Sequence, residues 1–393
     1  MDAVANPYSP GAGRPPAALV GRDAQLRSWD VALRRTAAGR GAQSVVLYGL
    51  RGVGKTVLLS AFAKRARSSG WITAKLEAGS GRTLRASLGE ALHAPLADLA
   101  RPGAGTRLLR ALKTALSFKA SYDSTGTWNF GLDLSGQPSG GADSGSIEAD
   151  LGKVLHDIAV AAEDDGVGLA LLVDEAQDLS SEELTALCAV THLAGQDGWP
   201  LLVALAGLPS LPRILAEAKS YSERLFDFAH IRELDQDLAL SAITEPAAAE
   251  GVAWEVQAAE LVVRETAGYP YFLQQLGQDT WNLAATSPIS LADARAGAER
   301  GRGALDTGFF RVRWDRATRA EQRYLRAMAL DGDAGSASGV VAERVGRKVT
   351  ALGPVRASLI GKGLIYAPEH GVVAYTVPGM AAFITRQPED ERG

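Results

Sequence analysis

A glycine-rich turn between two apolar stretches constrains this chain more than any other feature. Residues 44–48 read Ser-Val-Val-Leu-Tyr, residues 49–56 read Gly-Leu-Arg-Gly-Val-Gly-Lys-Thr, and residues 57–63 are mostly apolar. The turn fits the pattern G-x-x-x-x-G-K-[ST] at every fixed position. The alternative, a chance glycine turn, is disfavoured because an apolar run precedes the turn and a helical pattern follows it. We therefore predict a buried strand, a phosphate-binding loop (P-loop) and a helix, in that order.

The residue types of this loop suit the binding of a nucleotide. Glycines tolerate positive φ and let the backbone fold around an anion, towards which the loop amides and the helix N-terminus point. Lys55 would reach the β- and γ-phosphates, and the Thr56 hydroxyl would hold Mg²⁺. The expected nucleotide-binding residues of the loop are Gly49, Gly52, Val53, Gly54, Lys55, Thr56 and Val57.

A second motif follows an apolar run further along the chain. Residues 167–173 are apolar, and Asp174 and Glu175 come directly after them. A strand that ends in two carboxylates is typical of the second half of a P-loop ATPase signature. Asp174 would hold Mg²⁺ through water, and Glu175 would polarise the attacking water. Together with Lys55 upstream, this pair predicts an ATPase that uses ATP and Mg²⁺.

Strands and helices alternate around these motifs. Apolar runs at residues 71–77 and 200–207 predict further strands, with helical stretches between them. This alternation implies an α/β fold with a parallel, doubly wound sheet. Residues 237–300 are mostly helical in pattern and predict a compact bundle. Residues 119–148 are rich in Ser, Gly and Asp and predict a polar insertion with a short strand or hairpin at 127–134, either a functional loop or a surface excursion.

The C-terminal residues carry a different pattern. Thr318 and Glu321 fit a capping box that opens a helix. Two more short helices and a two-stranded hairpin over residues 363–377 follow, and this order predicts a winged helix. Between Arg319 and Lys362 there are eight basic and four acidic side chains, although the whole chain has a formal net charge of -4. This local positive charge leaves DNA contact and protein contact equally open.

Composition argues against several other classes of protein. The chain has 46% hydrophobic and 22% charged residues, as a globular protein does. Cys188 is the single cysteine, so it cannot form an internal disulfide, and we expect a buried thiol. No run of 18 apolar residues predicts a membrane span, and no basic segment with an apolar core predicts a secretory signal. These features predict a cytoplasmic protein.

With these motifs in place, the chain resembles AAA+ ATPases of the origin-recognition type and the related STAND signalling ATPases, over about residues 19–380. In such families the N-terminal motif that Val20-Gly21-Arg22-Asp23 resembles lies against the adenine, which assigns Gly21 and Arg22 to the nucleotide. Gly268-Tyr269-Pro270 is similar to the G-x-P element of STAND proteins, which places Pro270 near the base.

The resemblance extends to one arginine, and the chain departs from the family pattern in two places. Arg224 falls where such families often carry a catalytic arginine that approaches the γ-phosphate, in the same subunit or a neighbour; a surface salt bridge is the equally open alternative. The strand that ends at Gly207 lacks the polar sensor residue of many AAA+ enzymes, and the lid helices show no clear second-sensor arginine. These departures favour a switch that hydrolyses ATP slowly.

The sequence therefore predicts a P-loop NTPase of AAA+-like fold with an all-α lid and a C-terminal winged helix. Its nucleotide state would control the winged helix, with double-stranded DNA as a partner and a homo-oligomer formed on ATP binding. The alternative is a STAND-type signalling or scaffold ATPase whose winged helix is a protein-contacting latch. The predicted regions are a flexible N-terminal arm at 1–18, the ATPase core at 19–236, the lid at 237–300, a linker at 301–317 and the winged helix at 318–388.

Overall fold

The computed structural model describes residues 1–79, 81–99, 106–120 and 141–388. The chain divides into two compact units. The first, which we call the sheet unit, contains Arg22–Tyr48 and Lys55–His230. The second, which we call the helical unit, contains Met1–Gly21, Gly49–Gly54 and the chain from Ile231 onward. The strand or hairpin predicted at 127–134, within the insertion at 119–148, lies outside the described residues.

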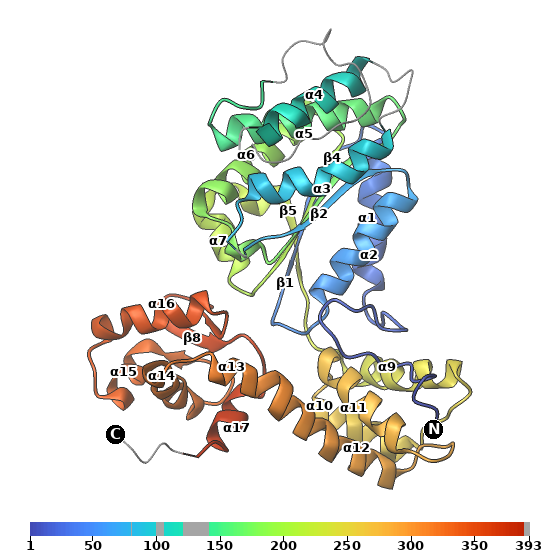
Figure 1. Cartoon of the computed structure of the whole chain (residues 1–393), viewed down its shortest axis with the longest axis vertical. Helices are drawn as coiled ribbons and strands as arrows, with labels where there is room; N and C mark the ends of the chain where they lie inside the picture. The colour runs from blue at the N-terminus through green and yellow to red at the C-terminus, as the bar shows by residue number, and fades with distance from the viewer. Residues whose placement is uncertain (80, 100–105, 121–140, 389–393) are drawn as a thin grey trace. The chain divides into compact units, whose positions relative to one another are not determined.

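A five-stranded parallel sheet forms the centre of the sheet unit, and Figure 1 shows it among the helices of that unit. Its strand order is β2-β3-β4-β1-β5. The strands are β1 Ser44–Tyr48, β2 Ile72–Glu77, β3 Leu169–Asp174, β4 Leu201–Gly207 and β5 Phe226–His230. In β1, Tyr48 lies opposite Gly207 of β4 and His230 of β5. The predicted parallel α/β fold is confirmed. The last strand, β5, begins at Phe226, which packs in the core of the sheet unit.

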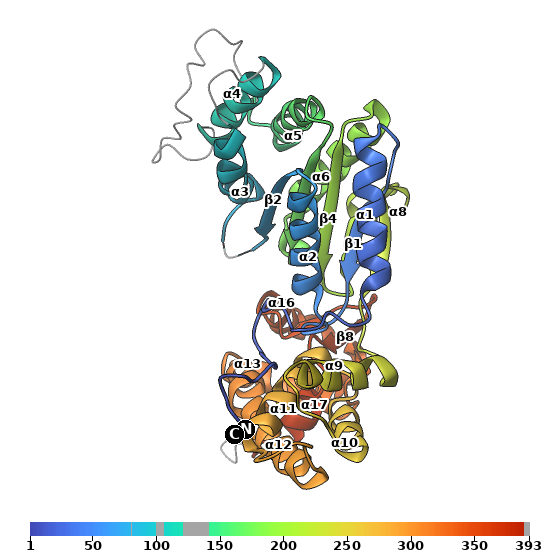
Figure 2. The ribbon, with the colours of Figure 1, turned by 90° about the vertical axis from the view of Figure 1, so that its right-hand side faces the viewer.

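Helices cover both faces of this sheet (Figure 2). They are α1 Asp23–Ala37, α2 Lys55–Ser68, α3 Leu84–Leu99, α4 Thr106–Ala120, α5 Ile147–Glu163, α6 Ser181–Asp197, α7 Leu211–Ala218 and α8 Ser222–Leu225, with a short turn η1 at Ala176–Asp178. Helix α2 packs on β2, β3 and β4, and α1 packs on α2 through stacked rings of Trp29 and Phe62. Leu171 and Val203 point to the other face, into one core with α3 to α6. Burial on both faces is the rule for parallel sheets.

The helical unit contains the remaining elements. They are α9 Gln236–Ala249, α10 Val256–Thr266, α11 Pro270–Leu283, α12 Leu291–Ala304, η2 Leu305–Phe310, α13 Arg311–Asp315, α14 Arg319–Ala329, β6 Ser336–Ala337, α15 Ser338–Val345, η3 Val349–Leu352, α16 Gly353–Gly361, β7 Ile365–Tyr366, β8 Val372–Tyr375 and α17 Met380–Thr385. The strands form a small antiparallel sheet, β6-β8-β7. We call residues 318–388 the C-terminal module. Its three helices and hairpin follow the predicted order, whereas β6 and α17 were not predicted.

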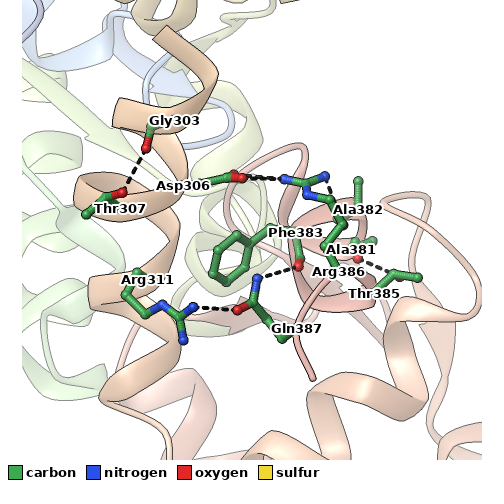
Figure 3. A network of polar contacts seen from close by, with 10 residues as sticks. All are labelled: Gly303, Asp306, Thr307, Arg311, Ala381, Ala382, Phe383, Thr385, Arg386 and Gln387. Carbon is green, nitrogen blue, oxygen red and sulfur yellow. Dashed lines mark hydrogen bonds and ion pairs between the residues drawn. The ribbon is translucent and has the colours of Figure 1, made fainter. Parts of the chain in front are cut away.

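Residues 301–315 are helical, so the prediction of a linker over 301–317 is wrong. Helix α12 continues into η2 and α13, and Leu305, Phe310 and Trp314 are buried in a hydrophobic core that also includes residues of α9 to α11 and of the C-terminal module. Most of the charged side chains of this segment are exposed, whereas Arg313 is half-buried over the ring of Phe309. Two of them fix α17, because Asp306 accepts hydrogen bonds from Arg386 at 2.8 and 2.9 Å and Arg311 donates one to Gln387 at 2.6 Å (Figure 3).

The N-terminal arm packs on the lid, in contrast to its predicted flexibility. Tyr8 is 1% exposed, and its ring meets the edges of Trp254 and Trp281 at 6.4 Å each. Its hydroxyl donates a hydrogen bond to the carbonyl of Ile243. Through Tyr8 the arm joins the core of the helical unit.

Two further expectations concern the chain as a whole. Cys188 is buried in the core of the sheet unit, and burial raises the pKa of its thiol to about 11. None of the helices among the described residues is long and apolar enough to cross a membrane.

Candidate nucleotide site

The P-loop backbone has the conformation that its glycines predicted. Gly52 and Gly54 have φ of +91° and +95°, values that residues with a side chain rarely adopt. A Cβ at Gly49 would lie 2.1 Å from the carbonyl oxygen of Ile231, so no larger residue fits there. The loop ends where Lys55, which is only 8% exposed, begins α2. A loop with these angles at a helix N-terminus is a suitable cradle for phosphate.

Three hydrogen bonds hold the middle of the P-loop within the helical unit. The amide of Arg51 donates to the carbonyl of Thr376, which follows β8, at 2.9 Å. The hydroxyl of Tyr269 donates to the carbonyl of Arg51, and the amide of Tyr271 donates to the carbonyl of Gly52 at 3.3 Å. Burial raises the pKa of Tyr269, which keeps its hydroxyl protonated as a donor.

The two predicted carboxylates lie at the end of β3. Asp174 is 5% exposed, and its Oδ1 accepts a hydrogen bond from the amide of Glu175 at 3.0 Å. Glu175 has φ of +50°, in the left-handed region that costs a residue with a side chain about 1 kcal/mol. Gln177, two residues later, donates from Nε2 to Oε2 of Glu175 at 2.6 Å. The turn therefore holds Glu175 in one orientation.

Sheet topology brings the P-loop helix and the carboxylates to the same edge of the sheet unit. Strands β1 and β3 flank β4 in a parallel sheet, so Tyr48 and Asp174 end their strands on one side, two strand spacings or about 10 Å apart. Lys55 and Thr56 follow β1 after the loop.

The donor set fits a magnesium ion that arrives with a nucleotide. Among the described residues there is no group of three or more His, Cys, Asp and Glu side chains that could hold a metal ion. Mg²⁺ in nucleotide sites is held by one or two protein oxygens together with phosphates and water. Thr56 and Asp174 supply such oxygens, and the metal would neutralise charge on the phosphates there.

Arg224 lies at the opposite edge of the sheet. It belongs to α8, directly before β5, and its carbonyl accepts a hydrogen bond at 3.1 Å from Gln43, which precedes β1. One strand of five residues, or roughly 13 Å, separates this edge from the carboxyl end of β1. The prediction that Arg224 approaches the γ-phosphate of its own chain therefore conflicts with its position. That Arg224 approaches the γ-phosphate bound to a neighbouring subunit stays a prediction.

The remaining predicted nucleotide-binding residues occupy well-defined local positions. Gly21 has φ of +71°, and a Cβ there would lie 2.9 Å from a side-chain carbon of Leu238. Arg22 is 8% exposed and precedes α1. Pro270 is the first residue of α11, where its missing N–H costs no hydrogen bond.

Three features of the site were missed at the sequence level. These are the bridge made by Gln177, the hydroxyl of Tyr269 on the P-loop, and the stacking of His230 on Tyr48 with ring centroids 4.7 Å apart. Only Gln177 carried a usable signal, because it follows the carboxylates within one turn. The other two depend on which strands and helices become neighbours.

Comparison with known proteins agrees with this fold. Residues 18–204 match the family described as AAA ATPase domain, and residues 307–384 match a domain of unknown function (DUF8462). Comparison with curated protein sequences gives no significant match.

The structure is similar to solved structures along most of its length. The Walker-type ATPase PABY2304 of Pyrococcus abyssi is 17% identical, with a TM-score of 0.58 over 95% of this chain and 98% of that one. The RuvB Holliday junction branch migration motor of Thermotoga maritima is 14% identical, with a TM-score of 0.45 over 91% and 94%. Cdc6p from Pyrobaculum aerophilum is 13% identical, with a TM-score of 0.46 over 98% and 97%. The chain has the fold of P-loop AAA+ ATPases, and the domain match supports an ATPase of this class.

Proposed function

We propose that this protein is an ATP-hydrolysing switch whose nucleotide state controls the C-terminal module. In this proposal Lys55 and the P-loop amides bind the phosphates, while Thr56 and Asp174 hold Mg²⁺. Glu175 accepts the proton of the attacking water while the terminal phosphoryl group is transferred to the oxygen of that water. The AAA ATPase domain match over residues 18–204 supports this assignment.

One contact carries the proposal of a switch. The P-loop amide of Arg51 is bonded to the carbonyl of Thr376, in the C-terminal module. A nucleotide that reorders the P-loop therefore changes the environment of this bond, and the position of the module in turn affects the loop. A ligand shifts such an equilibrium by its differential affinity for the two states. The module is thus a latch on the loop that binds the phosphates.

The charges of the C-terminal module favour a latch over a DNA reader. Arg344 is paired with Asp331 at 2.6 and 2.7 Å, and Lys362 is paired with Glu321 at 2.6 Å. Arg326 donates to main-chain carbonyls of the C-terminal segment. Three of the eight basic side chains that suggested DNA contact are therefore used inside the module.

The predicted recognition helix supports the same conclusion. Over η3 and α16 the exposed large hydrophobic side chains are Val349 and Ile360, at 50% and 38% exposure, and the one basic side chain, Arg356, is partly buried. A DNA-reading helix would instead present polar and basic groups to base edges and phosphates. We therefore prefer the proposal of a protein-contacting winged helix.

DNA association is a second candidate, and one observation favours it. Arg347 and Lys348 are exposed at the turn between α15 and η3, where a helix-turn-helix protein meets the DNA backbone. In both versions the chain acts in the cytoplasm and forms a homo-oligomer with ATP, in which Arg224 approaches the nucleotide of a neighbouring copy.

The test combines amide exchange and sizing. A non-hydrolysable ATP analogue with Mg²⁺ should change amide exchange at residues 372–377 relative to ADP, and Lys55→Ala should abolish the difference. Equal exchange with both nucleotides would contradict the switch. Sizing the same samples with and without duplex DNA separates the protein-contacting latch from the DNA-associated module. A DNA-associated module would be retained on DNA, and its retention would fall steeply with salt because it depends on phosphate contacts.

A further inference from the structure

The side chain of Gln177 forms hydrogen bonds that link the carboxyl ends of strands β3 and β4. Gln177 lies in η1, directly after β3, and its Nε2 donates to Glu175 Oε2 at 2.6 Å. The same amide group accepts from the main-chain N–H of Leu208, one residue past β4, at 2.9 Å through its Oε1. The side chain therefore bonds to the carboxylate and to the residue after the neighbouring strand, and its Nε2 also donates to Asp178 Oδ1 at 3.3 Å.

The end of β4 is shaped to admit this side chain. A Cβ placed on Gly207 would lie 2.5 Å from Gln177 Oε1 and 2.8 Å from a side-chain carbon of Leu211. Glycine is therefore required at 207 for Gln177 to reach the backbone of β4. This explains how β4 can lack a polar side chain at its carboxyl end, since Gln177 supplies the polar group from β3.

We propose that Gln177 is a positioning residue for Glu175, and that it transmits movements of the end of β4 to that carboxylate. This inference rests on the proposed hydrolysis of ATP. In that reaction a bond forms between the water oxygen and the terminal phosphorus, the bond from that phosphorus to the leaving oxygen breaks, and Glu175 accepts the water proton.

The positioning role follows from the bonds of Gln177 to Glu175 and to Leu208. A carboxylate on a long side chain would sample several rotamers, whereas the Gln177 amide selects one of them for Oε2. The left-handed backbone of Glu175 restricts the orientation further. Because misplacement of a reacting group by about 1 Å can cost about 100-fold in rate, this restraint matters for turnover.

Gln177→Met tests the proposal, because methionine preserves the length of the side chain and removes its three hydrogen bonds. We expect kcat for ATP hydrolysis to fall about 10- to 100-fold, with KM and nucleotide affinity within about twofold of the wild-type values. Gln177→Glu should be at least as impaired, since a second carboxylate beside Glu175 repels it. Gln196→Met, at an exposed site on α6, is the matched control and should hydrolyse normally.

Two further variants separate positioning from a loss of structure. Gly207→Ala should reproduce the fall in kcat by displacing Gln177, and adding Gln177→Met to Glu175→Gln should cause no further loss. Unchanged kcat in Gln177→Met, or a fall accompanied by an equal rise in KM and loss of thermal stability, would overturn the inference alone. A wild-type chain that binds ATP without any turnover would overturn the proposed hydrolysis and this role together.

Discussion

The carboxylate turn at residues 174–178 and the P-loop segment at residues 49–54 are both held in place, but by contacts of different range. In the turn, Glu175 is restrained by Asp174 and Gln177, its neighbours in sequence. In the P-loop, Arg51 is held by a hydroxyl 218 positions later and by the carbonyl of Thr376. The turn belongs to the sheet unit and the loop segment to the helical unit.

The carboxylate turn carries groups proposed for hydrolysis, whereas the P-loop segment makes the contacts proposed for the switch. The groups proposed for hydrolysis are positioned within the sheet unit, by a short motif and by the bond between Gln177 and Leu208 at the end of β4. The P-loop segment is restrained by the lid and the C-terminal module, so its conformation depends on theirs. A switch needs this second kind of contact, because only a long-range contact can link a remote module to the bound phosphates.

The largest expected effect concerns the locally held turn. Glu175→Gln removes the proposed base but preserves the shape of the turn, so hydrolysis should fall about 100- to 10,000-fold while ATP stays bound. Phosphate release and equilibrium binding of a fluorescent ATP analogue measure the two quantities. Glu182→Gln, an exposed site on α6, is the control. Hydrolysis at the wild-type rate would show that the base lies elsewhere.

Lys55→Ala changes the first residue of α2, which directly follows the P-loop segment. Loss of charge-assisted contacts to phosphate, worth about 2–3 kcal/mol, should weaken ATP binding roughly 30- to 150-fold. Calorimetric titration with ATP and Mg²⁺ measures this change. Lys64→Ala, an exposed lysine of the same helix, should bind normally. Equal affinity in both variants would contradict the phosphate role.

The pair of Glu321 and Lys362 tests a long-range contact inside the C-terminal module. Burial alone would raise the pKa of Glu321, but hydrogen bonds from Lys362, Ser358 and Thr318 outweigh it and lower the pKa to about 2. A depressed carboxyl pKa contributes stability that is present above the unfolded pKa of about 4.3 and is lost as pH falls towards about 2.

The wild-type chain should therefore lose up to about 3 kcal/mol of its stability advantage over Glu321→Gln between pH ~4.3 and pH ~2. Urea unfolding at a series of pH values measures the free energy of both chains. Glu343→Gln, an exposed site on α15, is the control and should follow the wild type. A pH-independent difference between wild type and Glu321→Gln would contradict the assigned pKa.

The smallest expected effect concerns the P-loop restraint itself. Tyr269→Phe removes the hydroxyl that bonds to the carbonyl of Arg51, at a cost of about 0.5–1.5 kcal/mol. Amide exchange of residues 49–54 should accelerate up to about tenfold. Tyr271→Phe is the matched control, since Tyr271 contacts Gly52 through its main-chain N–H. Equal exchange in the two variants would show that the hydroxyl does not hold the loop.

Much of the fold could be predicted because its signals are local. The apolar runs that became β1, β3 and β4 are buried, and a parallel sheet follows from their alternation with helices. The linker was predicted wrongly for a physical reason. Leu305, Phe310 and Trp314 look like scattered apolar residues among charges, but all three join the core of the helical unit, where Phe310 stacks on Phe383 of α17.

The residues of the candidate site also divide into those that a local pattern identifies and those that depend on the tertiary structure. Lys55, Thr56, Asp174 and Glu175 were identified because each stands at a required position of a short pattern. Arg224 was assigned by its order in the chain, which cannot tell the two edges of a sheet apart. Its position before β5 became evident only once the strand register was known.

The sequence by itself determined that this chain carries a P-loop on a parallel sheet, because glycine spacing and apolar periodicity act within a few residues. Only the tertiary structure decided what holds that loop. Tyr269 and Thr376 reach Arg51 because the lid and the C-terminal module share one hydrophobic core, and no local pattern records which distant surfaces pack together.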